Sequence, residues 1–165
     1  MGAASGKIYV SYGQFHLKGS EYFDPTEWDP NRGNGLIDAL KEPGLPAVPG
    51  EFAILRTGRR DGYISLTVDV RDDRPEQGDL DEWEDVAEVS VQVEEDDIFG
   101  VGTVEEAGDD DRFPTLAEGQ YRIRVHARGR QASRASQGDD SIKEEFLLLM
   151  WPAEPEPEVV LKTSR

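Results

Sequence analysis

The sequence predicts an all-β fold, a single-domain antiparallel β-sandwich, with a partly open β-barrel as the alternative. Three observations predict this fold. Short segments in which apolar and polar residues alternate recur along the chain, and this period of two is typical of strands with one buried face. Turn-forming residues separate these segments, and evidence for helices is thin. The chain has 165 residues, about the length of one domain and enough to bury a core.

The first half of the chain is expected to contain three strands. Lys7–Leu17 (KIYVSYGQFHL) is a long strand candidate with a glycine at which it could bend. Glu51–Thr57 and Tyr63–Val70 flank the turn signal GRRDG and predict a β-hairpin. Residues 24–50 are rich in Gly and Pro and predict a long mobile loop, in which Leu36–Lys41 could form one helical turn.

The second half is expected to contain the other strands, and the candidates are Asp85–Val93, Phe99–Val104, Gln120–Arg128, Glu145–Trp151 and Val159–Lys162. Glu145–Trp151 is apolar on both faces, which predicts a central strand covered on both sides, and Val159–Lys162 predicts a final edge strand. Residues 129–143 are small, polar and charged and predict a mobile connection. The Pro-rich residues 152–158 predict an extended segment.

Alternation within these strands also predicts which side chains fill the space between two sheets. The expected core residues are Ile64, Leu66, Val68, Val89, Val91, Ile123, Val125, Leu147 and Leu149. No internal repeat and no second domain boundary is visible, so residues 1–165 are expected to form one domain.

The negative charge of the chain is concentrated in one stretch. The formal net charge is −17, from 35 acidic and 18 basic residues. Between Asp72 and Gly119 there are 19 acidic and 2 basic residues, so this stretch alone carries the whole excess. Such a charge argues against nucleic acids and anionic membranes as partners, since phosphate binding needs a cationic surface. It favours a basic protein or a cation, although acidic loops can also serve solubility alone.

One strand candidate, YRIRVHARGR (residues 121–130), contrasts with this acidity. Its polar face is cationic and carries Arg122, Arg124, His126 and Arg128. Opposite charges across a sheet stabilise a strand pair. We therefore expect the arginines to face Glu88, Glu94 or Asp69 on neighbouring strands. The alternative is an anion pocket on that face.

The acidic stretch predicts a partner-binding surface. The runs EEDD (94–97) and GDDD (108–111) flank the same short strand candidate, so loops at one end of the sandwich could present them together. Aromatic residues lie among the acids and could anchor an interface, although each is also a core candidate. The candidate partner-binding residues are Asp72, Asp73, Trp83, Glu94, Glu95, Asp96, Asp97, Phe99, Asp109, Asp110 and Asp111.

A second function class uses the same acidic loops. Clustered carboxylates can supply the six to eight oxygen ligands that Ca²⁺ takes, so a Ca²⁺- or small-ligand-binding module is the alternative. The candidates for such a site are Asp72, Asp73, Glu95, Asp96, Asp97, Asp109, Asp110 and Asp111. No EF-hand pattern is present, and no metal or other cofactor is expected.

Sequence signatures of catalysis are missing. The chain has no cysteine, no G-x-S-x-G motif, no phosphate-binding glycine loop, and only His16 and His126 as histidines. A non-enzymatic protein is therefore expected. No segment approaches the length of an apolar membrane span and the start lacks the apolar core of a signal peptide, which predicts a cytoplasmic protein.

Four stretches resemble the competence protein J family: SYGQF (11–15), GYISLTVDV (62–70), GQYRIRVHARGR (119–130) and EEFLLLMWP (144–152). Together with the order of the strands, they cover about half of the chain. The resemblance implies a small acidic bacterial protein that inhibits a DNA-entry nuclease. An inhibitor of this kind would place carboxylates where the phosphates of a nucleic acid bind. None of the four stretches is a catalytic signature, so no functional residue is carried over.

Overall fold

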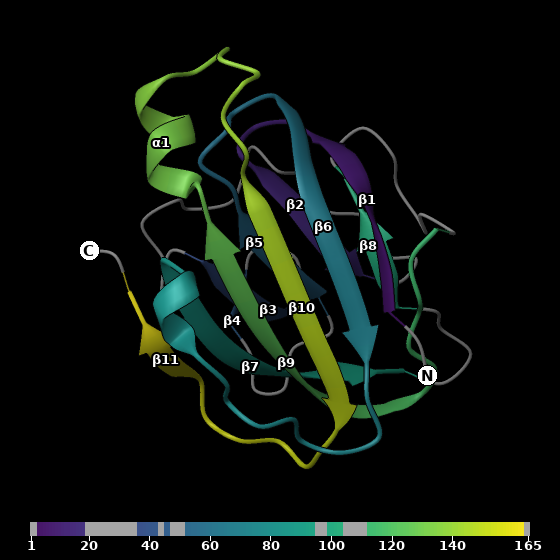
Figure 1. Ribbon diagram of the computed structural model, residues 1–165. Helices are drawn as coiled ribbons and strands as arrows, with labels where there is room; N and C mark the ends of the chain where they lie inside the picture. Colours follow the sequence, from purple (N-terminus) through teal and green to yellow (C-terminus); the bar gives the residue numbers. More distant parts are fainter. Residues whose placement is uncertain are drawn as a thin grey trace.

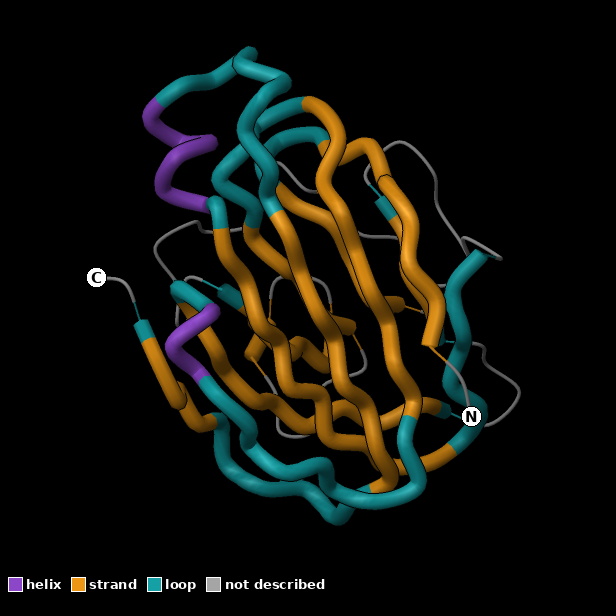
Figure 2. The backbone as a smooth tube through the Cα atoms, in the orientation of Figure 1, coloured by secondary structure: helices purple, strands orange, loops and turns teal. Residues whose placement is uncertain are grey.

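The computed structural model describes residues 3–18, 36–42, 45–46, 52–94, 99–103 and 112–163. These residues form two β-sheets packed face to face, with short helices at the margin of the larger sheet (Figure 1, Figure 2). The predicted all-β sandwich is therefore confirmed. Within the described residues the two sheets do not close into a barrel.

The larger sheet has six strands in the order β1-β6-β10-β9-β7-β11. Their bounds are β1 Ala3–Val10, β6 Gly62–Val70, β10 Glu145–Pro152, β9 Gly119–Arg128, β7 Asp85–Val93 and β11 Val159–Lys162. All neighbours are antiparallel except β6 and β10, which run parallel. The sheet is therefore mixed, and not purely antiparallel as the sequence predicted. β11 is an edge strand, as predicted.

The smaller sheet has five strands in the order β4-β3-β5-β2-β8, and all of its pairs are antiparallel. Its bounds are β4 Leu45–Pro46, β3 Ile37–Glu42, β5 Phe52–Arg56, β2 Gln14–Lys18 and β8 Gly100–Gly102. Outside the sheets lie the 3₁₀ helix η2 (Leu80–Glu82) and the helix α1 (Arg130–Ala135). The helical turn predicted at Leu36–Lys41 is wrong, because that segment belongs to β3; residues 24–35 lie outside the described part.

The core lies between the sheets and contains side chains from both. Phe15 of β2 meets Phe146 of β10 edge to face, with ring centroids 5.2 Å apart and planes at 89°, a geometry that aromatic pairs favour. Every predicted core residue from β6, β7 and β9 is in this cluster.

The predicted positions on β10 are wrong by one residue. Phe146, Leu148 and Met150 belong to the core cluster, while Leu147 and Leu149 lie on the opposite face of the strand. Since a shift of one residue exchanges the two faces of a strand, a segment that is apolar on both faces gives no sign of which face is inside. The central position predicted for this strand is confirmed.

At two places in the first half of the chain, the structure has a passage from one sheet to the other where the sequence predicted a continuous strand or a hairpin. The single strand predicted at Lys7–Leu17 is instead β1 and β2, separated by a turn in which Tyr12 and Gly13 have φ of 58° and 67°. The predicted hairpin of β5 and β6 is also wrong, because these strands belong to different sheets. Alternation of apolar residues is the same before a hairpin and before a crossover, so it cannot distinguish them.

The connection predicted to be mobile at residues 129–143 contains α1 and is tied to the body by buried polar groups. Glu144 is 1% exposed and accepts hydrogen bonds from the main-chain N–H groups of Gly58 and Arg59, at 2.7 and 2.8 Å. Arg130 pairs with Asp85 at 2.8 Å. Burial raises the pKa of Glu144, and these N–H donors oppose the increase only in part. Because Gly58, Arg59 and Asp85 are far away in the sequence, the composition of residues 129–143 gave no sign that this connection is ordered.

Gly58 lies where α1 meets the body and has no room for a side chain. A Cβ atom built on it would be 2.0 Å from the main-chain oxygen of Arg130. We expect Gly58→Ala to lower the free energy of unfolding by more than about 2 kcal/mol, because backbone would have to move. Gly6→Ala is the control, since its nearest contacts would be ordinary ones at 3.5 Å. Urea unfolding of both variants measures the difference, and equal stabilities would contradict this packing.

Candidate functional site

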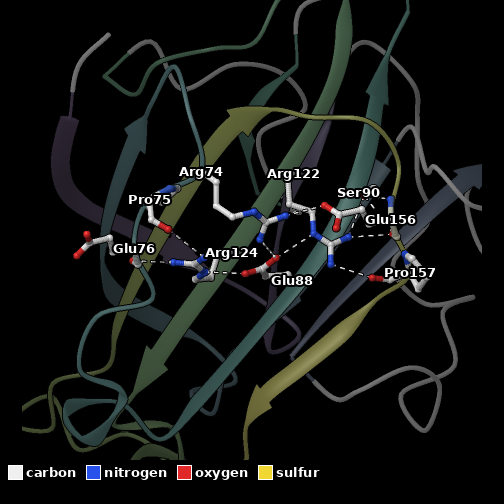
Figure 3. A network of polar contacts seen from close by, with 9 residues as sticks. All are labelled: Arg74, Pro75, Glu76, Glu88, Ser90, Arg122, Arg124, Glu156 and Pro157. Atoms are coloured by element: carbon white, nitrogen blue, oxygen red, sulfur yellow. Dashed lines mark hydrogen bonds and ion pairs between the residues drawn. The ribbon is translucent and has the colours of Figure 1, made fainter.

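The outer face of β9 and β7 carries a polar network (Figure 3). Alternation along β9 directs Ile123 and Val125 into the core and places Arg122 and Arg124 on the other face of the strand. In the antiparallel register, Glu88 of β7 lies opposite Arg124. The next residue on the same face, Ser90, lies opposite Arg122.

Glu88 is a buried carboxylate shared by two buried guanidinium groups. Its Oε1 accepts a hydrogen bond from Arg122 Nε at 3.0 Å, and its Oε2 accepts one from Arg124 Nε at 2.8 Å. The three side chains are 2–5% exposed. The more exposed Arg74 adds a third contact, from Nη1 to Oε1 at 3.1 Å. The predicted pairing of the cationic strand with Glu88 is therefore confirmed.

The other two pairings that the sequence suggested do not form. Asp69 pairs with Arg71 at 2.8 Å, and Arg128 pairs with Glu145 at 3.0 Å. Glu94 is exposed at the end of β7 and accepts a hydrogen bond from Gln92 Nε2 at 3.3 Å. The anion pocket considered as the alternative is also not formed here, because carboxylate and carbonyl oxygens of the chain itself occupy the arginine donors.

The protonation state of Glu88 depends on these contacts. Burial alone would raise the pKa of Glu88, but hydrogen bonds from Arg124 and Arg122 outweigh burial and hold it below the usual value. Glu88 is therefore ionised at neutral pH. Removing one partner of a buried ion pair typically costs about 3–5 kcal/mol, because the remaining charge is left without compensation. Loss of Glu88, Arg122 or Arg124 is therefore expected to destabilise the fold strongly.

Arg122 Nη1 donates to Ser90 Oγ at 2.9 Å, and the other outer contacts of both arginines are with main-chain carbonyls of two loops. Arg124 donates from Nη1 and Nη2 to the carbonyl oxygens of Glu76 and Pro75, at 3.1 and 3.4 Å. Arg122 donates in the same way to the carbonyl oxygens of Glu156 and Pro157, at 2.9 and 2.8 Å. The two loops, residues 71–84 and 153–158, are called the acidic cover below. Figure 2 shows them running side by side from the ends of β6 and β10.

The acidic cover concentrates exposed carboxylates on one side of the molecule. Those exposed are Asp72, Asp73, Glu76, Asp79, Asp81, Glu82, Glu154, Glu156 and Glu158. Because the buried arginines bind the main-chain carbonyls of the cover and not its carboxylates, few of these charges are neutralised. Glu156 pairs with Arg74 at 2.6 Å. Within the described part of the chain, Asp72, Asp73, Asp81, Glu82 and Glu154 have no ion-pair partner.

The acidic cover brings together two segments that lie far apart in the sequence. Asp72 and Asp73 were predicted as partner-binding residues and are exposed in the cover. The three glutamates of the Pro-rich segment 152–158 were not predicted to belong to the same surface. The composition of this segment could have predicted an acidic surface, since PAEPEPE contains three acidic residues and no basic residue.

The aromatic residues predicted as anchors are not free. Phe99 is 2% exposed and belongs to the core, so its prediction as an interface anchor is wrong. Trp83 is half-buried at the end of η2, where its ring packs against the Arg128 guanidinium at 4.5 Å and the His126 ring at 5.3 Å. Both contacts attach the cover to β9.

Among the described residues, the exposed aromatic side chains belong to tyrosines, which the sequence did not single out as anchors. Tyr9 and Tyr63 lie opposite each other on β1 and β6, are 43% and 57% exposed, and meet edge to face at 5.2 Å. Alternation could have identified Tyr9, because its neighbours Ile8 and Val10 are both buried. These tyrosines lie on the same outer face of the larger sheet as the cover.

Six predicted residues cannot be placed. Glu95, Asp96, Asp97, Asp109, Asp110 and Asp111 lie outside the described residues. Of the calcium candidates, only Asp72 and Asp73 are described. In the described ranges, no group of three or more His, Asp or Glu side chains is placed to hold a metal ion. No described helix is long and apolar enough to cross a membrane.

Fold and site together define an all-β sandwich protein with an acidic cover on one sheet. No family model matches the chain, and no curated protein matches it either. The resemblance to the competence protein J family therefore stays a hypothesis. Among solved structures, the chain is similar to the protein "Crocagin biosynthetic gene J", with a TM-score of 0.53 and 13% identity. The match covers 93% of this chain and 98% of that one, and at this identity it concerns the fold alone.

His126, whose ring packs against Trp83 of the cover, is expected to make the stability of the fold depend on pH. Burial lowers the pKa of His126 and the nearby Arg124 adds to this, while the Leu147 carbonyl and Glu88 oppose it. A histidine with a lowered pKa in the folded state stabilises the fold above its unfolded pKa of about 6.5, and the stabilisation is lost as pH falls through the folded pKa. We expect His126→Gln to lose less stability than the wild type between pH 7.5 and 5. Urea unfolding at both pH values tests this, and parallel losses would contradict it.

Proposed function

We propose that this protein is a non-enzymatic protein-binding domain whose acidic cover binds a basic protein. The most specific form of the proposal is an inhibitor or immunity protein of a basic enzyme such as a nuclease. A cytoplasmic location, expected from the sequence, belongs to the same proposal. One observation carries it: the cover exposes unpaired carboxylates, while the arginines beneath it bind its main chain.

The buried guanidinium groups of Arg122 and Arg124 bind carbonyls of the acidic loops and so reduce the electrostatic repulsion between these loops. Arg122 and Arg124 lie directly below loops that would otherwise repel each other, and they leave the carboxylates of both loops facing solvent. A concentrated negative surface steers a cationic partner and raises its association rate. A nuclease that grips phosphates presents such a partner surface, because phosphate binding needs clustered Lys and Arg.

The contact surface extends beyond the cover. Interfaces combine charged contacts with aromatic anchors, and the exposed pair Tyr9 and Tyr63 lies on the same outer face. Three strand spacings, roughly 14 Å, separate β1 from β9. Along the strands, Tyr63 lies six residues, roughly 20 Å, from the level of Asp69 and Arg124, but close to the level of Arg128, which packs against Trp83. A partner that covers about 800 Å² of this protein would therefore reach the tyrosine pair together with the η2 end of the cover.

Charge reversal in the cover tests this function. We compare Asp72→Lys/Asp73→Lys/Glu154→Lys with a control that changes the same charge elsewhere, Asp61→Lys/Glu118→Lys/Asp140→Lys. The wild type and the control are expected to capture a basic protein from native cell lysate at low salt. The cover variant is expected to lose at least about 90% of this capture, because attraction becomes repulsion.

Two outcomes would contradict the proposal. One is capture of the same protein by the cover variant, with elution at the same salt concentration as for the wild type. The other is no specific capture together with a melting temperature that rises with added Ca²⁺, since a ligand that binds the folded state raises its stability. The second result would favour the calcium-binding alternative.

A further inference from the structure

The C-terminal segment of the described chain is attached to the sandwich without entering its core. Residues 153–162, called the strap below, include the extended part of the cover and β11. No strap residue belongs to the core cluster, and Val159 and Val160 are 42% and 49% exposed. Most of the residues between them and β10 are exposed as well. Leu161 is half-buried, so the strap stays in place mainly through polar contacts and strand pairing, with little burial of apolar side chains.

Those contacts recognise an extended main chain and one carboxylate. The N–H of Ala153 donates to the Gln120 carbonyl at 3.1 Å, and the N–H of Glu156 donates to Ser90 Oγ at 3.0 Å. Arg122 binds two successive carbonyls, those of Glu156 and Pro157. The carboxylate of Glu156 binds Arg74 at 2.6 Å (Figure 3). Beyond these residues the strap continues as β11, which pairs with β7.

This combination is one of the recurring ways in which domains recognise extended peptides. Adding a strand to a sheet edge gives affinity through main-chain hydrogen bonds, and side-chain contacts give specificity. The groups that bind the strap are Arg74, Ser90, Gln120 and Arg122. The strand to which β11 is added is β7. They require an extended main chain with one acidic residue at Arg74, since the contacts at Glu156 and Pro157 with Ser90 and Arg122 are made to main-chain groups.

We propose that the outer face of β7 and β9 is a peptide-binding groove, which the strap occupies in the isolated chain and which accepts an acidic, extended segment of another protein when the strap opens. Opening would remove Glu156 from Arg74. Arg74, Arg122 and Arg124 would then face Glu88 with an excess of positive charge. The open groove thus favours an occupant that brings a carboxylate and free carbonyls.

Charge makes another protein the favoured occupant over the strap of a second copy. Exchange of straps would bring together two chains with a net charge of −17 each, and charge of this size keeps proteins apart. A partner segment of strap chemistry needs only one acidic residue at Arg74. This proposal can be tested independently of the proposed binding of a basic protein. Peptide binding is measured with no basic protein present, and it does not depend on Asp72 or Asp73.

The strap has the features of a segment that opens on its own. β11 has four residues and one neighbouring strand, and its pairing with β7 is irregular between Val160 and Lys162. Segments with few buried contacts open with free energies well below that of global unfolding. Native-state hydrogen exchange of the wild type is therefore the first test. The amides of Glu156 and β11 are expected to exchange at least about 100-fold faster than those of β9, and exchange of both only by global unfolding would overturn the proposal.

Peptide binding is the second test and uses a fluorescent peptide of residues 153–162. A tethered strap competes at an effective concentration in the millimolar range, so the wild type should bind the peptide weakly. Pro155→Gly/Pro157→Gly increases the conformational entropy of the open strap and leaves the residues of the groove unchanged. This variant is expected to bind the peptide at least about tenfold more tightly than the wild type. Near-ultraviolet circular dichroism verifies that it is folded.

Groove variants in the same background identify the site. Ser90→Ala and Arg74→Gln should each weaken peptide binding about tenfold, while Ser65→Ala on the open face of β6 should leave it unchanged. A peptide of the same composition in scrambled order should not bind. The proposal is overturned if the folded glycine variant does not bind the peptide or if groove variants bind it equally well. Dimers of the wild type that form by strap exchange would also overturn it, since the occupant would then be a second copy.

Discussion

The carboxylate of Glu88, held between Arg122 and Arg124, is the interaction on which the outer half of this protein depends. It lets two cationic side chains lie buried against a sheet face, where an unpaired charge would be costly. Once their Nε atoms are fixed, the outer ends of both guanidinium groups point to the loops above. There they bind the carbonyls of residues 75–76 and 156–157.

This constraint explains why so acidic a chain contains a cationic strand. The arginines of β9 neutralise one buried carboxylate and bind the main chain of the cover. The acidic side chains of the cover are therefore left exposed to solvent, where the excess negative charge lies. The cover is therefore acidic on its surface and cationic beneath. Both proposals follow from the two sides of this layer: the surface attracts a basic protein, and the groove beneath recognises an acidic extended segment.

The sequence predicted the strands better than their arrangement, for physical reasons. Alternation identifies a half-buried strand such as β7 or β9, but it is unchanged at a corner where the chain passes to the other sheet, as after Val10. β10 is apolar on both faces, so its orientation had to come from packing. At the site, the pairing of Arg124 with Glu88 was predictable because opposite charges attract across strands. The contacts with the carbonyls of Pro75 and Pro157 were not, because a carbonyl is present at every residue.

The most direct test of the Glu88 network is nuclear magnetic resonance of the arginine Nε–H groups in the wild type. The Nε–H protons of Arg122 and Arg124 donate to Glu88 at 3.0 and 2.8 Å. We expect both to exchange with water much more slowly than a free arginine at neutral pH, because Glu88 is ionised there and accepts both protons. The exposed Arg60 supplies the reference for fast exchange. Exchange of Arg122 and Arg124 as fast as that of Arg60 at neutral pH would contradict the account.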